Sequence, residues 1–457
     1  MRYLSTRGAA GLISFEEAVL TGLAPDGGLL LPERLPDLGN ELDRWRGLEF
    51  VDLAAQVMRL FVGELETRAL RELLARSYAS FDHSAVTPIV QLSNVSVLEL
   101  FHGPTLAFKD VALQFLGNLF EVILERRDAS MNVLCATSGD TGSAAIAGAR
   151  GKRGIRIFVL YPNGRTSRLQ ELQMTTVADA NVHCIAVNGS FDDCQLIMKT
   201  VFNDLPFKSR HRLGAMNSVN WARVLAQVVY YVYAALRLDA HGRKPVSFSV
   251  PTGNFGDILA GYLARLIGLP IERLVCATNE NDILSVFFNT GVYRRGEVRY
   301  TITPSMDIQV ASNLERFLYL RLGCDSVRLR AFMETFARSG EARIDDGLPV
   351  APEIVATAVS KDETMATIRD VWTREGYLLD PHSAVGIAAA RRFDVNGAMV
   401  CLATAHPAKF PESVDQAVGK PVARHPALER LHALPERKTA LPADVAEIKR
   451  FIAAHAL

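Results

Sequence analysis

Several features that would identify a protein class are missing from this chain of 457 residues. Its six cysteines form no CxxC pair, and neither its cysteines nor its histidines show metal-ligand spacing, so we expect no zinc or redox motif and no catalytic metal. Lysine plus arginine equal aspartate plus glutamate at 50 each, and the resulting net charge of +0 argues against a general nucleic-acid binder. These absences favour an enzyme that acts on small molecules.

Long hydrophobic runs are also absent. The longest strongly apolar run, 228–236, is too short to span a bilayer, and the residues after Met1 hold no apolar core of a signal peptide. Because most cysteines lie in apolar stretches that suit reduced core thiols, we expect a cytoplasmic protein with no membrane association. The chain has no internal repeat, no P-loop, no H-E-x-x-H and no G-x-S-x-G motif.

The patterns that are present divide the chain into three parts. Residues 1–95 read as an N-terminal unit of short helices and turns, in which Ser14 and Glu17 predict a capping box. Through 96–240, and again through 241–457, strand-like runs alternate with helical periodicity, and the last part ends in a helical tail. Such alternation predicts an α/β fold with a mostly parallel, helix-covered sheet.

Lys109 is the first candidate for chemistry. Gly103 and Pro104 punctuate the chain before it, and from Val111 apolar residues recur mostly at spacings of three and four, so Lys109 is expected to begin a buried helix. Burial and the positive end of the helix dipole both lower the pKa of a lysine, which suits a Schiff-base or proton-transfer amine. The alternative is a lysine whose stem covers apolar surface while its ammonium reaches water.

Two loops combine a strand, a small polar turn and a helix, an arrangement that presents backbone N–H groups to an anion. The loop at 137–141 adds hydroxyl groups, which suit a carboxylate, and the loop at 253–256 has two glycines that let the backbone approach a phosphate closely. Neither contains G-x-G-x-x-G, so neither is a dinucleotide fingerprint. The alternative for each loop is a plain tight turn.

A third candidate opens a helix predicted over 221–238. Asn217, Ser218 and Asn220 are helix-capping residue types, and Arg223 follows in the first turns. An arginine there opposes the helix dipole and requires an anion, either a ligand or a carboxylate in a buried salt bridge. An activated lysine, a phosphate loop, a carboxylate loop and this group together fit an amino-acid enzyme that uses pyridoxal phosphate.

Five motifs along the chain resemble those of the threonine synthase family, and the start, Met1–Gly8, is similar to that of its longer bacterial and fungal branch. The motifs are 103–110 (GPTLAFKD), 138–142 (SGDTG), 217–223 (NSVNWAR), 253–256 (GNFG) and 404–407 (TAHP). The resemblance implies fold type II of the pyridoxal-phosphate enzymes. Two α/β domains with open, twisted, mostly parallel sheets would hold the cofactor between them, with the N-terminal unit added.

This resemblance implies that the chain would convert O-phospho-L-homoserine and water into L-threonine and phosphate. Lys109 would hold pyridoxal phosphate and later act as a base at the substrate Cα, and Thr404 would face the pyridine nitrogen. The residues implied for the cofactor phosphate are Gly253, Asn254, Phe255 and Gly256, and Asp257 and Asp140 are also implied to bind the cofactor. Those implied for the substrate carboxylate are Thr137, Ser138 and Thr141, and those for the substrate phosphate are Asn217, Ser218 and Arg223.

Asp140 departs from the wider fold family, many of whose members carry asparagine beside the cofactor's ring oxygen. An aspartate donates no hydrogen bond there unless it is protonated. We also expect packed or capping roles for His102, His382 and His406, and a monomer or weak homodimer.

Three other functions remain open. A threonine-synthase-like phospholyase would share the early steps and release phosphate, a 2-oxo acid and ammonia. Serine or threonine dehydratase chemistry would not need the anion site at 217, 218 and 223. A non-catalytic ligand-binding module would need neither the lysine nor the two loops.

Overall fold

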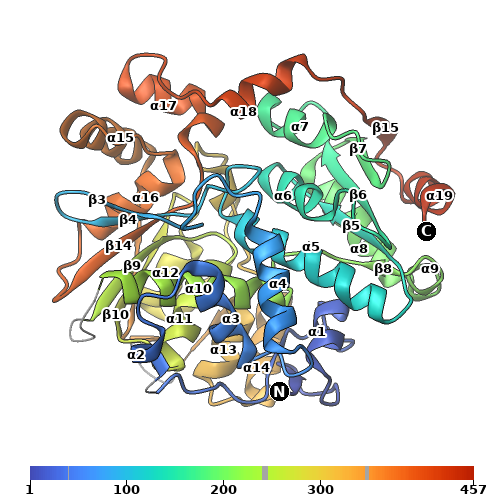
Figure 1. The fold of residues 1–457 in the computed structure, drawn as a ribbon, viewed down its shortest axis with the longest axis horizontal. Helices are drawn as coiled ribbons and strands as arrows, with labels where there is room; N and C mark the ends of the chain where they lie inside the picture. Colours follow the sequence, from blue (N-terminus) through green and yellow to red (C-terminus); the bar gives the residue numbers. More distant parts are fainter. Residues whose placement is uncertain (40, 239–244, 345–348) are drawn as a thin grey trace.

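The computed structural model describes residues 1–39, 41–238, 245–344 and 349–457, and it contains two main β-sheets flanked by helices (Figure 1). One sheet lies on the left of Figure 1 and the other on the right, with the N-terminal helices in blue in front of the lower part. This arrangement confirms the predicted α/β fold with two mostly parallel, helix-covered sheets. Within the described residues, no helix combines the length and the hydropathy needed to cross a membrane.

The first sheet has six strands in the order β13-β10-β9-β14-β4-β3. In that order they are β13 (Ile354–Ala358), β10 (Ile271–Thr278), β9 (Val246–Pro251), β14 (Ala398–Ala403), β4 (Ser96–Glu99) and β3 (Ile89–Gln91). All neighbouring pairs are parallel except β3 and β4 at the edge. The central strand β9 is buried at every residue, as expected of a strand with helices on both faces of its sheet.

The second sheet has five parallel strands in the order β15-β7-β6-β5-β8. They are β15 (Thr439–Pro442), β7 (Val182–Asn188), β6 (Ile155–Pro162), β5 (Met131–Ala136) and β8 (Leu213–Gly214). Its helices are α5 (Lys109–Arg126), α6 (Asp140–Ala149), α7 (Arg168–Thr175), α8 (Phe191–Asn203), α9 (Leu205–Arg210) and α19 (Val445–His455). Both α5 and α6 begin at residues singled out above, Lys109 and Asp140.

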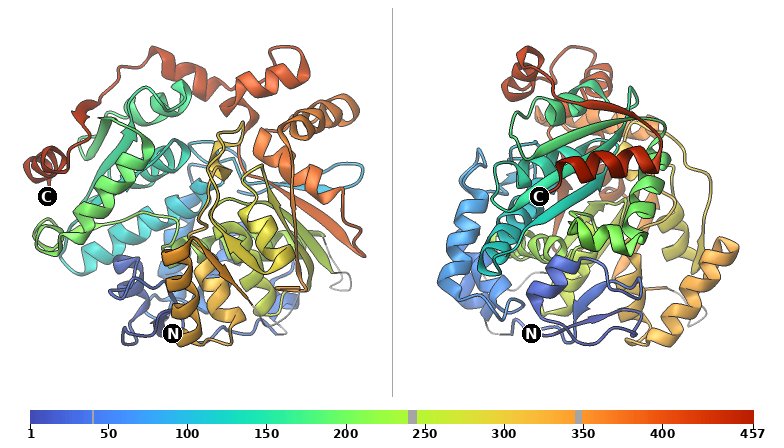
Figure 2. Two further views of the ribbon diagram at one scale, coloured as in Figure 1. Left: turned by 180° about the vertical axis from the view of Figure 1, so that it is seen from behind. Right: turned by 90° about the vertical axis from the view of Figure 1, so that its right-hand side faces the viewer.

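Both sheets take strands from across the expected boundaries near 96 and 241. β4 pairs with β14 and not with β5, although it precedes β5 directly in the chain. β15, in the tail expected to be helical, pairs with β7, and Figure 2 shows this C-terminal segment in red reaching the second sheet. The three-part division stays a prediction, but the hydrogen-bonded sheets do not follow it.

The N-terminal unit packs into the same core as the rest of the chain. It contains a two-stranded antiparallel sheet and four helices: β1 (Tyr3–Ser5), β2 (Leu30–Pro32), α1 (Phe15–Thr21), α2 (Glu41–Trp45), α3 (Phe50–Arg59) and α4 (Thr67–Tyr78). The predicted capping box is confirmed, since the Glu17 N–H donates to Ser14 Oγ and the Ser14 N–H donates to the Glu17 carboxylate. The Tyr3 ring lies 5.9 Å from Trp221, which begins the central helix.

That central helix, α10 (Trp221–Leu238), is buried from its first residue to Ala235 and packs against α3, α5 and α11 (Gly256–Leu266). α5 and α6 cross so closely that a Cβ added at Gly117 would clash with the Gly148 carbonyl.

The remaining elements are α12 (Ile283–Thr290), β11 (Val292–Arg294), η1 (Pro304–Met306), α13 (Leu314–Arg321), α14 (Ser326–Ser339), β12 (Glu341–Arg343), α15 (Lys361–Glu375), α16 (Pro381–Ala390), η2 (Pro407–Lys409), α17 (Pro411–Val418), α18 (Pro426–Glu429) and η3 (Arg430–Ala433).

Candidate active site

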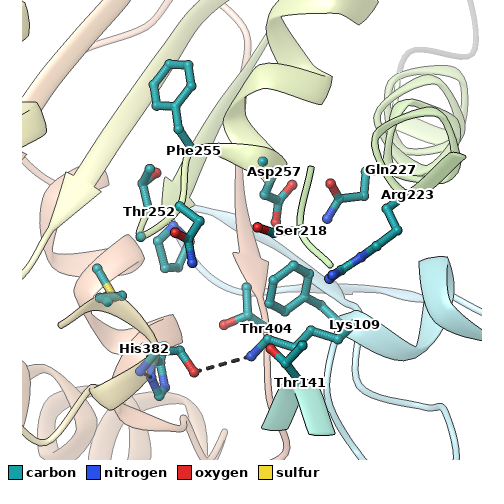
Figure 3. Close-up of a pocket in the computed structure, with 17 residues that line it drawn as sticks. Lys109, Thr141, Ser218, Arg223, Gln227, Thr252, Phe255, Asp257, His382 and Thr404 are labelled. Carbon is teal, nitrogen blue, oxygen red and sulfur yellow. Dashed lines mark hydrogen bonds between the residues drawn. The ribbon is translucent and has the colours of Figure 1, made fainter. Parts of the chain in front are cut away.

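A pocket lies at the carboxyl ends of β9 and β14 (Figure 3). Ligands of open α/β sheets bind at this end of the strands. Ten of the predicted residues line it: Lys109, Thr141, Ser218, Arg223, Gly253, Asn254, Phe255, Gly256, Asp257 and Thr404. The other four, Thr137, Ser138, Asp140 and Asn217, are not among its lining residues.

Lys109 is the first residue of α5, and its side chain lies in the cavity. The residue is 9% exposed, so the alternative of an ammonium that reaches water is wrong. Its Nζ donates to Ser305 Oγ at 3.3 Å and lies 3.6 Å from Asp140 Oδ2. Burial lowers the pKa of Lys109, and the positive charges of Lys409 and Arg223 act in the same direction, while Asp140 opposes them.

The loop after β9 is shaped to receive an anion. Phe255 has a φ of +62°, a left-handed conformation that is unusual for a bulky residue, and its ring stacks on Phe288 at 5.7 Å. A Cβ at Gly253 would lie 2.5 Å from the Ser305 carbonyl, so this position requires glycine. For the N–H groups of 253–256 the structure provides no protein acceptor among the residues it describes. Several free N–H groups at the start of α11 form an anion site.

Thr404 ties the lysine helix to the first sheet. It follows β14 directly, and its carbonyl accepts from the Phe108 N–H at 2.8 Å, one residue before Lys109. The Thr404 N–H donates to Ser383 Oγ at 3.1 Å. These two bonds hold its backbone at the rim, where the side chain lines the cavity.

Arg223 and Gln227 extend from α10 toward the cavity in Figure 3. Arg223 is 5% exposed, and its Nε and Nη1 have no hydrogen-bond partner among the described residues. Burial lowers the pKa of Arg223 to about 10, and no carboxylate contributes to that shift. The alternative of a buried salt bridge is therefore not supported, and the guanidinium is free to bind an anion in the cavity.

Ser218 connects the two anion-binding loops. Its Oγ lies 3.0 Å from Ser312 Oγ, and the Ser312 hydroxyl donates to Asn254 Oδ1 at 3.3 Å. The Asn217 side chain instead stabilises the turn of its own loop, because its Oδ1 accepts a hydrogen bond from the Val219 N–H at 3.2 Å. Of this pair, Ser218 lines the cavity and Asn217 supports the loop.

Of the loop at 137–141, only Thr141 lines the cavity. Thr137 Oγ1 accepts from the N–H groups of Gly139 and Gly142 at 3.0 and 2.9 Å, so it holds the loop in shape. Asp140 is buried, and although burial alone would raise its pKa, the charges of Lys409 and Lys109 lower it well below the usual value. Asp140 is therefore an ionised acceptor.

Asp257, in the first turn of α11, is a buried carboxyl group of a different kind. Its Oδ1 accepts from the hydroxyls of Tyr230 and Tyr231 at 2.5 and 2.9 Å, and its Oδ2 has no partner among the described residues. Burial raises the pKa of Asp257 to about 6, against the opposing effect of the two tyrosine hydrogen bonds.

Three family models match the chain. Residues 2–78 match the model described as threonine synthase N terminus, 81–404 that of the pyridoxal-phosphate dependent enzymes, and 383–452 that described as threonine synthase, C-terminal. The chain belongs to the threonine synthase family. It is therefore a pyridoxal-phosphate-dependent enzyme, as the sequence motifs predicted.

Full-length relatives agree with membership of the threonine synthase family. The chain is 46% identical to a threonine synthase of Pseudomonas aeruginosa, over 100% of this chain and 98% of that protein. It is also 46% identical to one of Schizosaccharomyces pombe, over 91% of this chain and 89% of that protein. The crystal structure of pyridoxal-phosphate-bound threonine synthase from Brucella melitensis superposes with a TM-score of 0.96 at 45% identity, covering 100% of this chain and 99% of that one. Threonine synthase function and fold type II, both predicted above, are confirmed by this similarity.

The residues around the cavity fit the cofactor that the threonine synthase family uses. The loop 253–256 offers unpaired N–H groups to a phosphate, and Gly253 leaves room for close approach. Lys109 supplies a buried amine of lowered pKa in the same cavity, and Thr404 supplies a hydroxyl. Pyridoxal phosphate needs these three features: a lysine, a phosphate cup and a partner for its ring nitrogen.

The sequence motifs did not reveal every residue that lines this cavity. Those that were not predicted are Phe108, Gln227, Pro251, Thr252, Ser305, Met306 and His382. Gln227 follows Arg223 by four residues on α10, so helical spacing could have indicated it. Ser305 lies in the short helix η1, which had no sequence signal of its own.

His382 lines the cavity and is also held in place by hydrogen bonds. Its Nε2 accepts from the Ser305 N–H at 3.3 Å, so its Nδ1 carries the proton and faces Asp380 Oδ1 at 3.0 Å. His406 fulfils the predicted capping role, since its side chain accepts from the Ala408 N–H. His102 is held between Asp82 and Glu99.

Proposed function

We propose that this chain converts O-phospho-L-homoserine and water into L-threonine and phosphate in the cavity at Lys109. The observation that carries the proposal is the buried guanidinium of Arg223, which reaches that cavity without a carboxylate partner among the described residues. A phosphorylated substrate supplies the missing anion, whereas the unphosphorylated substrate of a dehydratase does not.

The cofactor site lies beside this anion site. In the proposal Lys109 would hold pyridoxal phosphate, and Thr404 would be the partner of its ring nitrogen, with a neutral hydroxyl that would not force protonation of the ring. The residues assigned to the cofactor phosphate are Gly253, Asn254, Phe255 and Gly256. When bound, the cofactor takes up the negative charge that develops as a proton leaves the substrate carbon next to the amino group.

Lys109 is the base of the proposed reaction. Burial lowers the pKa of Lys109, which favours the neutral amine that is assigned to remove the proton from the substrate Cα. Ser305 Oγ, 3.3 Å from Nζ, restricts where that amine points. The same amine is assigned to the proton that leaves Cβ and to the later return of a proton.

Arg223 and Ser218 are assigned to the phosphate that departs from Cγ. The charge on the leaving oxygen increases as the bond breaks, and a buried guanidinium stabilises it more than a solvated one. Thr141 and the N–H groups at the start of α6 are assigned to the substrate carboxylate. Thr137, predicted for the carboxylate, and Asn217, predicted for the phosphate, act in this proposal by shaping their loops. Ser138, also predicted for the carboxylate, is exposed and does not line the cavity.

Product analysis tests the proposal. The purified holoprotein is incubated with O-phospho-L-homoserine, and phosphate, threonine and 2-oxobutyrate are quantified together. We expect phosphate and threonine in equal amounts. Phosphate with 2-oxobutyrate and ammonia would reassign the chain as a phospholyase, and absence of all products from a protein loaded with cofactor would refute the role of Arg223.

A further inference from the structure

Lys409 is a second buried lysine near the cavity, and the reaction proposed above does not use it. It ends η2, shortly after Thr404, and its side chain is 1% exposed. Its Nζ donates to the Thr105 carbonyl at 2.7 Å and to Gln173 Oε1 at 2.8 Å, and lies 3.0 Å from Asp140 Oδ1. These contacts compensate an ammonium that burial would otherwise disfavour strongly.

Asp140 connects this lysine to the one in the cavity. Its Oδ1 faces Lys409 and accepts from Gln170 Nε2 at 2.9 Å, and its Oδ2 lies 3.6 Å from Lys109 Nζ. A Cβ at Gly139 would clash with the Gln170 side chain, so glycine there makes room for this contact. One carboxylate therefore bridges two lysines, of which only Lys109 lines the cavity.

Other charged and titratable groups line the same cavity or act electrostatically on one of the two lysines. They are Arg223 on α10, Asp257 on α11, His382 on α16 and Asp110 on α5. Arg223 disfavours a proton on Lys109, and Lys409 stabilises the charge of Asp110. Lys409 and Asp140 are in direct contact with each other, and neither residue lines the cavity.

The proposed reaction requires Lys109 to exist as a neutral amine and to take up and return a proton. Each time Lys109 becomes neutral, Asp140 loses one of the two cations that stabilise its charge. Lys409 remains beside Asp140 and keeps it ionised, so the mobile proton does not move to the carboxylate. Lys409 also repels a proton on Lys109, against the attraction of Asp140.

We propose that Lys409 is a positioning residue that acts on Lys109 through Asp140. It fixes Asp140 as a carboxylate and balances the attraction of that carboxylate for the ammonium of Lys109. The inference rests on the proposed role of Lys109 and adds to it a fixed charge outside the cavity lining. Removal of the Lys409 charge then makes Lys109 hold its proton more tightly, and removal of the Asp140 charge makes it hold the proton less tightly.

The test uses the apoprotein and measures how fast pyridoxal phosphate becomes covalently attached at each pH, trapped with borohydride. Only the neutral amine reacts, so the pH of half-maximal rate reports on the charge state of Lys109. We expect this midpoint to rise by about one pH unit in Lys409→Met and to fall by about as much in Asp140→Asn, because a single charge a few ångströms away shifts a titration by this order. Lys409→Arg keeps the charge and is expected to stay near the parent protein.

Opposite shifts distinguish the proposal from a purely structural role, in which Lys409 only anchors Thr105 and Gln173. Shifts of the same sign, or no shift in a folded Lys409→Met protein, would overturn it. If Lys409→Met does not fold, the double variant with Asp140→Asn removes both charges together and is expected to return the midpoint to near the parent value. A double variant that matches Asp140→Asn alone refutes the role of Lys409.

Lys109→Ala separates the two hypotheses. Loss of attachment in this control, with an unshifted Lys409→Met profile, refutes the positioning role alone. Undiminished attachment in Lys109→Ala refutes the proposed role of Lys109 itself.

Discussion

Replacement of Arg223 by methionine is expected to weaken substrate binding and, at the same time, to stabilise the protein without substrate. Arg223 is 5% exposed, and its Nε and Nη1 are unpaired among the described residues. Burial lowers its pKa from the ordinary value of an arginine to about 10. This difference corresponds to about 3 kcal/mol of unfavourable free energy for the charged guanidinium. Because the folded pKa lies below the unfolded one, the cost is fully present at neutral pH and is relieved only above about pH 10.

The two effects have different expected sizes. One charge-assisted hydrogen bond to the substrate phosphate contributes about 2 kcal/mol, so KM for O-phospho-L-homoserine is expected to rise at least about 30-fold. Covalent cofactor attachment is expected to change much less, since Lys109 and the loop 253–256 are untouched. In the absence of substrate and phosphate, the free energy of unfolding is expected to rise by about 1 to 3 kcal/mol, because methionine keeps most of the buried stem and removes the charge.

The chain offers a matched control in Arg316, which is also fully buried. Its Nε and Nη2 donate to the Leu30 carbonyl at 3.0 and 2.8 Å, its Nη1 to Asn313 Oδ1 at 2.7 Å, and its Nη2 also to the Val219 carbonyl at 2.6 Å. Arg316→Met leaves these acceptors unpaired and is expected to lower stability by about 2 to 4 kcal/mol. Thermal unfolding of both variants in phosphate-free buffer measures the change in stability, and steady-state kinetics measures the change in KM. An Arg223→Met protein that loses as much stability as Arg316→Met, or keeps its KM, would refute the reasoning.

Three further predictions concern other parts of the molecule. Lys109→Ala is expected to retain the circular dichroism spectrum of the parent but lose both turnover and borohydride-trapped cofactor, and full activity would contradict its assignment. Gly117→Ala is expected to lower the free energy of unfolding by about 1 to 3 kcal/mol, because its Cβ meets the Gly148 carbonyl. Gly11→Ala, where the added Cβ meets nothing within 4 Å, is the control and is expected to change little in the same denaturant titration. His183→Phe is expected to lessen the fall in Tm between pH 6.5 and 4. Burial lowers the pKa of His183 to about 4, so the folded protein keeps this side chain neutral while the unfolded chain already takes up a proton below pH 6.5. The stability that the neutral side chain contributes above pH 6.5 is therefore lost as the pH falls through this range. An unchanged pH dependence of Tm would show that another group titrates there.

Much of the candidate site was predictable because its residues follow local signals. Lys109 begins a helix whose apolar spacing is visible in the sequence, and it does begin α5. The Gly253–Gly256 turn follows a strand-like run and precedes a helical one, so its place at the start of α11 was expected. The unpaired state of Arg223 was not predictable, because a buried salt bridge and a ligand site have the same local sequence. Only the neighbours that the fold brings to the guanidinium distinguish them.

The fold class, the type of most helices and strands, and the family were already determined by the amino-acid sequence, since periodicity, capping residues and motif order are properties of short segments. The strand β15 is an exception, because it forms in a tail that was expected to be helical. Tertiary structure alone decided that β4 joins β14, that β15 joins β7, and that Lys409 lies 3.0 Å from Asp140. These contacts join segments hundreds of residues apart along the chain, and no local pattern encodes which distant partner a strand or a charge will meet. Lys409 follows a motif that the sequence did reveal, yet a lysine in a loop is usually solvated. Burial against the second sheet's helices is what makes its charge act on Lys109.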